Sequence, residues 1–256
     1  MTTVAGKSST THATEWVQET RFGKWFISTD IWIDYVLREA IADFHNMMGE
    51  RLPQRPVMLD VGCGIGLSFA PLDEMFQPQL IIGADIDQAS LQKARHTALH
   101  TTVLTARKTA RHAARPPRCE LRLLHSPAQR LELPDASVDI VFCHQLLHHV
   151  TAQHSVLREL HRVLRPGGFL LSGESCRSFI HSFWVRLLFR HPNMLQKSAE
   201  EYVELIRAAG FEVAQRDVRC TVPWWSRVDF GLLERLGLSS RRPATTEVNT
   251  VAIKPV

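Results

Sequence analysis

Short apolar runs that end in glycine or aspartate alternate with segments of helical periodicity along most of the chain. Such alternation is typical of strands joined by crossover helices in a sheet that is covered on both faces. It predicts strands over 57–61, 80–85, 119–124, 138–143, 169–172, 211–217 and 248–254. It predicts helices over 30–48, 65–76, 88–100, 152–164 and 199–209. The expected fold is α/β, a doubly wound seven-stranded sheet that is mostly parallel. Because no long helical segment separates the last two strands, we expect the last strand to run antiparallel.

All six tryptophans lie outside this predicted core, as Trp16, Trp25, Trp32, Trp184, Trp224 and Trp225. Aromatic side chains there could line an apolar pocket or fix a cap to the core, and both interpretations stay open. We divide the chain into a disordered tail (1–14), an N-terminal helical cap (15–55) and a main domain (56–256). The main domain carries a basic insert at 101–118 and a lid-like insert at 176–197.

Composition narrows the class of protein. With 256 residues, 45% of them hydrophobic, the chain can build one sizeable core, and wholesale disorder is excluded. The five cysteines form no CxxC pair, and no apolar leader precedes them, so we expect reduced thiols and a cytoplasmic protein. The net charge of +4 permits an anionic partner without requiring one.

The strongest chemical signal is a glycine-rich turn directly after the first predicted strand, with the sequence MLDVGCGIG over 58–66. Glycines there let the backbone approach a ligand closely, and the following helix offers unpaired N–H groups. Asp85 ends the second predicted strand, where nucleotide-binding folds place a ribose acceptor. A plain tight turn and a helix N-cap would explain the same residues. Nicotinamide dehydrogenases and S-adenosylmethionine methyltransferases remain the two enzyme classes to weigh, and GxGxG spacing departs from the dinucleotide pattern GxGxxG.

The sequence resembles the class I S-adenosylmethionine-dependent methyltransferases. The resemblance continues after the glycine turn through LELPDASVD at 131–139, HQLLHHV at 144–150 and LHRVLRPGG at 160–168. It covers about 57–174 in unbroken motif order and is closest to the branch of ubiquinone and menaquinone C-methyltransferases and other small-molecule enzymes. It implies an enzyme that binds S-adenosylmethionine and releases S-adenosylhomocysteine.

The resemblance also implies a cofactor site, formed by Asp60, Gly62, Cys63, Gly64, Gly66, Asp85, Ile86, Pro127, Ala128 and His144. In it Asp85 would bind the ribose hydroxyls, Ile86 would cover one face of the adenine, and Ala128 would offer its backbone amide. His144 would lie at the methionine end. Relatives commonly have an acidic residue just before that alanine, whereas this chain has Ser126-Pro127, so the adenine amine needs another acceptor.

Methyl transfer from a sulfonium depends mainly on alignment, although an acidic acceptor gains from a nearby base. His144 and His148 are the candidate catalytic residues, with a structural role as the alternative for His148 and for His149. No metal is expected, because Gln145 stands where the HExxH pattern has glutamate and no third ligand is evident.

The methyl acceptor is expected to be an apolar, aromatic or quinone- or lipid-like small molecule, with Trp25, Phe183, Trp184 and Trp224 as candidate contacts. The alternative is an RNA or protein methyltransferase that uses the basic segment 88–118, which has seven cations and no acid. In a doubly wound sheet that segment leads away from the ligand edge, so we do not expect nucleic acid as partner. A cofactor-binding scaffold without activity is the third interpretation.

Residues 177–197 form the expected lid. Apolar residues recur there at helical spacing, as Ile180, Phe183, Trp184, Leu187 and Leu188, and basic residues border them. One apolar face is predicted. A basic, amphipathic lid of this kind suits an apolar substrate taken from a membrane surface, with peripheral membrane contact, or an acidic aromatic taken from solution; a cap helix packed permanently on the core is the alternative.

Overall fold

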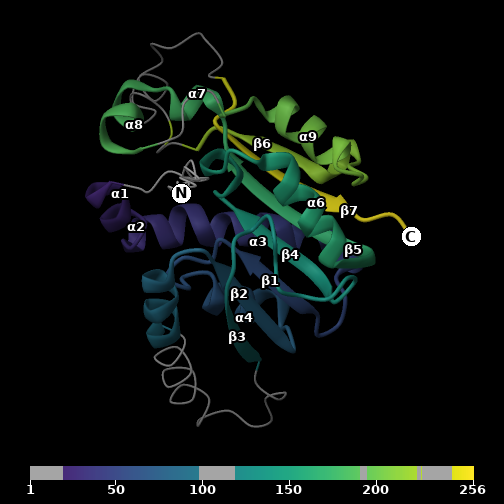
Figure 1. The fold of residues 1–256 in the computed structure, drawn as a ribbon. Helices are drawn as coiled ribbons and strands as arrows, with labels where there is room; N and C mark the ends of the chain where they lie inside the picture. The colour runs from purple at the N-terminus through teal and green to yellow at the C-terminus, as the bar shows by residue number, and fades with distance from the viewer. Residues whose placement is uncertain (1–19, 98–118, 191–194, 224–225, 227–243) are drawn as a thin grey trace, which may run out of the picture.

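The computed structural model describes residues 20–97, 119–190, 195–223, 226 and 244–256. Its centre is a seven-stranded sheet in the order β3-β2-β1-β4-β5-β7-β6 (Figure 1). The strands are β1 (Val57–Val61), β2 (Leu80–Asp85), β3 (Glu120–His125), β4 (Val138–His144), β5 (Leu164–Ser175), β6 (Val218–Thr221) and β7 (Glu247–Ile253). The first five strands pair in parallel, and β7 runs antiparallel to β5 and β6. The predicted fold class and the antiparallel last strand are confirmed.

Helices cover both faces of the sheet, as the doubly wound pattern predicts. On one face, α6 (Gln153–Val163) and α9 (Ala199–Ala208) bury their apolar sides against the strands. On the other face, α3 (Arg38–Met48), α4 (Phe69–Phe76) and the helical residues 88–97 pack on the sheet. The burial of these two apolar layers is the main stabilising contribution that the fold offers.

The remaining helices lie mostly beyond the ends of the strands, outside the two layers that cover the sheet. They are α1 (Arg21–Phe26), α2 (Asp30–Trp32), the π-helical η1 (Ile33–Leu37), α7 (Arg177–Ile180) and α8 (Phe183–Leu188). In Figure 1 they lie together beyond the carboxyl ends of the parallel strands, on the left of the view. Short 3-10 turns complete the fold as η2 (Gly49–Arg51), η3 (Leu147–His149) and η4 (Gln215–Asp217).

Several predicted boundaries were wrong for local reasons. The sixth strand spans 218–221 instead of 211–217, because a 3-10 turn that ends at Asp217 comes before it. The Asp217 carboxylate accepts two hydrogen bonds from Arg51, at 3.0 and 2.6 Å. Helix α4 begins at Phe69 instead of 65, because the glycine turn runs to Gly66 at a φ of +78°. The fifth strand begins earlier than predicted and takes in the sequence LRPGG at 164–168.

The lid-like insert is two short helices instead of one apolar face. Ser182 is extended between α7 and α8 and separates them. Ile180 and Val185 are buried while Leu187 is exposed, so Ile180 and Leu187, predicted on one apolar face, differ in exposure. No helix among the described residues is long and apolar enough to cross a bilayer. The five cysteines are free thiols.

Candidate active site

The turn between β1 and α4 holds three glycines in the left-handed region, at φ values of +75° for Gly62, +53° for Gly64 and +78° for Gly66. Two amides of the turn, from Gly62 and Cys63, donate to the Ala84 carbonyl at 2.8 and 3.1 Å, which fixes the turn to β2. A Cβ at Gly66 would come within 2.5 Å of a phenyl carbon, whereas a Cβ at Gly64 would meet nothing within 4 Å. The turn is therefore closed by protein at one end and has open space at Gly64.

Two carboxyl groups face this turn. Asp85, at the end of β2, accepts hydrogen bonds from the amides of Gly64 and Asp87, both at 2.8 Å, and burial raises its pKa. Asp60, at the end of β1, is only 3% exposed and accepts a hydrogen bond from the Ser68 hydroxyl. Burial raises the pKa of Asp60 to about 7, partly offset by the hydroxyl of Ser68. The predicted Asp60 and Asp85 thus lie together at one edge of the sheet.

The connection after β3 lies beside Asp85. The Ser126 amide donates to the Asp85 carbonyl at 3.0 Å, and the Ser126 hydroxyl donates to the Arg130 carbonyl at 2.6 Å. Pro127 and Ala128 follow in this turn, and Ile86 is exposed nearby, with its carbonyl 2.9 Å from His125 Nε2. The Ser126 hydroxyl uses its proton for the Arg130 carbonyl, and its oxygen lone pairs could still accept a hydrogen bond from the adenine amine, as the acidic residue of relatives does.

His144, at the end of β4, is surrounded by aromatic rings. Its imidazole is stacked on Phe142 with centroids 5.7 Å apart, and the indole of Trp32 lies 6.3 Å away. Burial, together with the nearby His148, lowers the pKa of His144 to about 3. The imidazole is therefore neutral near pH 7.

Gln145 follows His144 and is a residue that the sequence analysis did not single out for binding. Its φ of +54° is unusual for a residue with a side chain. Its amide donates from Nε2 to Glu247 at 3.0 Å and accepts from the Ser175 backbone at 3.3 Å. Glu247 also accepts from the Ser175 hydroxyl at 2.7 Å, and burial raises its pKa to about 8. Because β7 is antiparallel, its first residue reaches the edge where β4 and β5 end.

Glu174, near the end of β5, holds the segment that follows β4. Its carboxylate accepts the backbone amides of Leu146 and Leu147 at 3.1 and 2.8 Å, and the His148 ring at Nδ1, 2.6 Å away. The side chains of His148 and Glu174 are both buried. Sequence reasoning missed Glu174 and Glu247, because they lie just outside the predicted strands 169–172 and 248–254, whereas the observed strands β5 and β7 include them.

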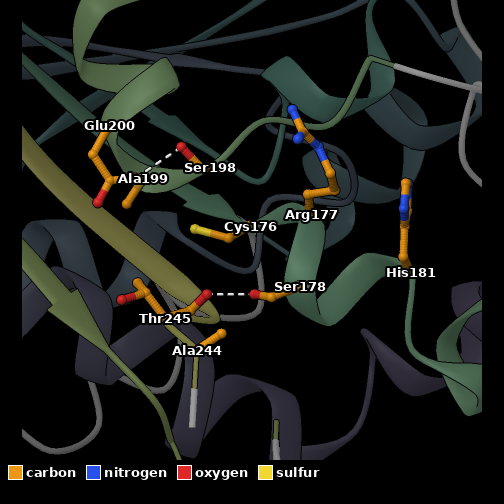
Figure 2. A pocket seen from close by; sticks show the side chains of 9 residues that line it. All are labelled: Cys176, Arg177, Ser178, His181, Ser198, Ala199, Glu200, Ala244 and Thr245. Atoms are coloured by element: carbon orange, nitrogen blue, oxygen red, sulfur yellow. Dashed lines mark hydrogen bonds between the residues drawn. The ribbon is translucent and has the colours of Figure 1, made fainter. Parts of the chain in front are cut away.

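A cavity of about 560 Å³ opens at the same edge, on the side of β5 and β7 (Figure 2). Its lining comes from α7, from the start of α9 and from the residues before β7, as Cys176, Arg177, Ser178, His181, Ser198, Ala199, Glu200, Ala244 and Thr245. Two hydrogen bonds cross this lining, from Ser178 to the Thr245 carbonyl and from Ser198 to Glu200 at 2.8 Å. The cavity has the size of a small-molecule site.

The structure brings the predicted cofactor residues to one edge of the sheet, at the carboxyl ends of β1 to β4. Of the candidate acceptor contacts, Trp25 is 58% exposed and faces outward. The side chains of Phe183 and Trp184, and all of Trp224, lie outside the described residues, as do the segments 1–14 and 101–118. Within the described ranges, no cluster of three potential metal ligands occurs.

Comparison with known proteins agrees with this geometry. Residues 59–172 match the family described as a methyltransferase domain. A Mycolicibacterium smegmatis protein, described as a probable S-adenosylmethionine-dependent methyltransferase, is 33% identical over 173 residues, which are 66% of this chain and 58% of the relative. The chain thus spans less than two thirds of that relative. The ubiquinone biosynthesis O-methyltransferase of Ruegeria pomeroyi is 26% identical over 82% of this chain and 84% of its own length.

A solved structure shares the fold. The S-adenosylmethionine-dependent methyltransferase of Mesorhizobium loti superposes with a TM-score of 0.57 at 16% identity, over 87% of this chain and 100% of the other. The open position at Gly64, the carboxylates of Asp60 and Asp85 and the strand order fit the cofactor of that family. Residues 59–172 of the chain therefore match a methyltransferase-domain family, on a fold shared with a solved S-adenosylmethionine-dependent methyltransferase.

Proposed function

We propose that this chain transfers a methyl group from S-adenosylmethionine to an apolar, aromatic or quinone- or lipid-like small molecule. The observation that carries this proposal is the position of Trp32, whose ring centroid lies 6.3 Å from that of His144 at the end of β4. Phe26 extends the aromatic wall, with its ring 5.9 Å from Trp32. An aromatic wall next to a neutral imidazole favours an acceptor with a flat apolar body over a polyanion such as RNA.

The cofactor would lie along the carboxyl ends of β1 and β2. Asp85 has oxygen lone pairs beyond those that serve the Gly64 and Asp87 amides, and these suit a pair of ribose hydroxyls. Asp60 suits the cofactor's amino group, because a positive charge beside a buried carboxyl favours its ionised form. When bound, S-adenosylmethionine supplies an activated methyl group on its sulfonium. The protein's contribution is then to orient the acceptor.

His144 and His148 differ in what they offer the acceptor. A pKa of about 3 makes the imidazole of His144 a weak proton acceptor, so we propose that it binds or orients the acceptor as a neutral ring. His148 has a carboxylate on Nδ1, the arrangement that orients a histidine base, but its side chain is buried. We propose His148 as the proton acceptor for substrates that need one, and Glu174 as the residue that positions it.

The aromatic flanks would hold the acceptor's body. We propose that Phe183, Trp184 and Trp224 contribute to this cap, with the lid-like residues 176–197 above the site, whereas the outward-facing Trp25 does not. The Ruegeria relative, which by its name methylates in ubiquinone biosynthesis, supports the same broad class of acceptor.

The decisive experiment is methyl transfer from S-[methyl-³H]adenosylmethionine to a fractionated cell extract, with and without RNase. We expect label in the organic-soluble small-molecule fraction, and RNase should change nothing. Label that stays with RNA or protein would favour the alternative macromolecular methyltransferase. No transfer by protein that binds the cofactor would point to a binding scaffold.

Once an acceptor is found, Trp32→Ala and Trp32→Phe test the aromatic wall. The alanine variant should raise KM for the acceptor at least about tenfold, because a buried aromatic contact contributes 1.5 kcal/mol or more, roughly. The phenylalanine variant should recover most of that loss. Cofactor affinity should stay the same in both, since the indole does not belong to the β1–β2 side of the site.

A further inference from the structure

The outer surface of the cap carries exposed large apolar side chains on α1, α2, η1 and α8. Trp25 is 58% exposed and Leu187 63% exposed, and two others are more than half exposed. The set comprises Phe22, Trp25, Ile31, Tyr35 and Leu187, and we call it the outer cap face. The other exposed large apolar residues in the described part of the chain, Ile86, Leu121 and Val256, lie on separate elements.

The elements of the outer cap face are in contact with one another. The Thr20 hydroxyl, before α1, donates to the Leu188 carbonyl of α8 at 2.6 Å. Phe189 packs edge-on against Phe22 and Phe26, with ring centroids 5.7 and 5.8 Å apart. Figure 1 shows α1, α2 and α8 on the same side of the molecule, beyond one edge of the sheet. The exposed residues therefore form a grouped apolar surface, which monomeric proteins generally use for an interaction.

Positive charge borders this surface. Arg21 on α1, Arg186 on α8 and Arg190 after it are exposed, and no acidic residue occurs in the sequence between Glu174 and Glu200. Asp34, on η1, is paired with Arg38 at 3.5 Å. The other acidic residue on α1, α2, η1 and α8 is Asp30, and it forms no ion pair with the described residues. Around the outer cap face these three exposed arginines outnumber the acidic residues Asp30 and Glu39, the latter exposed on α3 one helical turn after Tyr35.

We propose that the outer cap face docks on the surface of an anionic phospholipid bilayer. Tryptophan and tyrosine favour the level of the lipid headgroups, apolar side chains enter just below it, and arginines bind the phosphates. Trp32, on the same α2 that carries Ile31, contacts His144, so docking would turn the acceptor end of the site toward the membrane. The inference concerns a surface, and its readout, the binding of vesicles, involves no methyl transfer, so it fails or succeeds separately from the proposed function.

The test is co-sedimentation of the full chain with large vesicles of phosphatidylcholine, pure or with about one third phosphatidylglycerol. We expect binding to the anionic vesicles, weakened by 0.5 M salt and by the double variant Arg186→Gln/Arg190→Gln. Trp25→Ser/Leu187→Ser should lower the partition coefficient at least about tenfold. Leu121→Ser is the matched control: it removes an exposed apolar side chain from β3, at the far edge of the sheet, and should bind as the wild type does.

Each variant is first checked for an unchanged melting temperature and cofactor affinity, so that a misfolded protein does not count. Equal vesicle binding by Trp25→Ser/Leu187→Ser and the wild type would overturn the proposal. So would a concentration-dependent dimer that the same variant abolishes without any vesicle binding, because a second copy would then cover the face. Vesicle binding seen only after deletion of residues 1–19 would also overturn it, since that segment would occupy the face in the full chain.

Discussion

Replacing Asp85 with alanine should weaken binding of S-adenosylmethionine about 10- to 100-fold. The carboxylate accepts the Gly64 and Asp87 amides at 2.8 Å each, and its remaining lone pairs are the proposed partners of the ribose hydroxyls. A hydrogen bond to a charged acceptor contributes about 1.5 to 3 kcal/mol, and 1.4 kcal/mol is about tenfold in affinity. Loss of one ribose bond gives the lower limit. Loss of both ribose hydrogen bonds gives the upper limit. So does loss of one of these bonds if the Gly64 turn also becomes disordered.

Isothermal titration calorimetry measures this affinity, and Asp87→Asn is the matched control. Asp87 accepts the Ala89 amide at 3.1 Å and the Ser90 hydroxyl at 2.8 Å, at the start of the next helix. Because asparagine caps a helix about as well as aspartate, its replacement should change the melting temperature little and leave cofactor affinity within about twofold. Because burial raises the pKa of Asp85, affinity in the wild type should also fall as the pH drops and the carboxyl takes up a proton. An Asp85→Ala protein that folds normally and binds within about threefold of the wild type would refute the assignment.

Three further outcomes follow from the contacts described above. Gly66→Ala should strongly destabilise the fold, because the new Cβ would lie 2.5 Å from a phenyl ring. Gly64→Ala meets nothing within 4 Å, but its φ of +53° still costs about 1 to 2 kcal/mol, so it should destabilise the fold less and also lower cofactor affinity; thermal melting and calorimetry separate the two effects. Burial raises the pKa of Glu247 to about 8, so its contribution to stability is present below its unfolded pKa and is lost as the pH rises through 8. Glu247→Gln should therefore flatten the decrease in the free energy of unfolding between about pH 5 and 8, and urea denaturation at a series of pH values would contradict this if the slope stayed the same. Asp217→Ala should cost about 3 to 5 kcal/mol in urea denaturation, because it leaves a partly buried arginine without its partner, while Glu204→Ala, in an exposed pair, should cost less than about 1 kcal/mol; similar losses in both would mean that the buried pair contributes little.

The cofactor half of the site could be predicted from the sequence because each part of it is local. Gly62, Gly64 and Gly66 adopt positive φ, which few other residues tolerate, and so leave a visible trace in the sequence. Asp85 follows at the distance that one strand–helix–strand unit requires. The mostly parallel sheet followed from the same crossover pattern, and the absence of a long helix before the last strand indicated its antiparallel direction.

The acceptor half could not be predicted because its contacts join distant parts of the chain. Gln145 and Glu247 are 102 positions apart and meet only because β5 and β7 pair antiparallel. No periodicity encodes such a meeting. The sixth strand was placed too early for a related reason: Asp217 is buried by an ion pair with Arg51, which lies 166 positions away. Burial achieved through a distant partner leaves no apolar signal in the local sequence.

The antiparallel β7 has a consequence for how the protein can diversify. Thr221, the last residue of β6, is paired with Glu247, the first residue of β7, so the whole connection from 222 to 246 leaves and re-enters the sheet at the edge that carries the site. The entropy of closing a loop grows slowly with its length, by about 0.6 kcal/mol for each doubling. Residues can therefore be added to or removed from this connection at little cost to the fold. New acceptor contacts can arise there while the glycine turn, on the other side of the sheet centre, keeps its geometry.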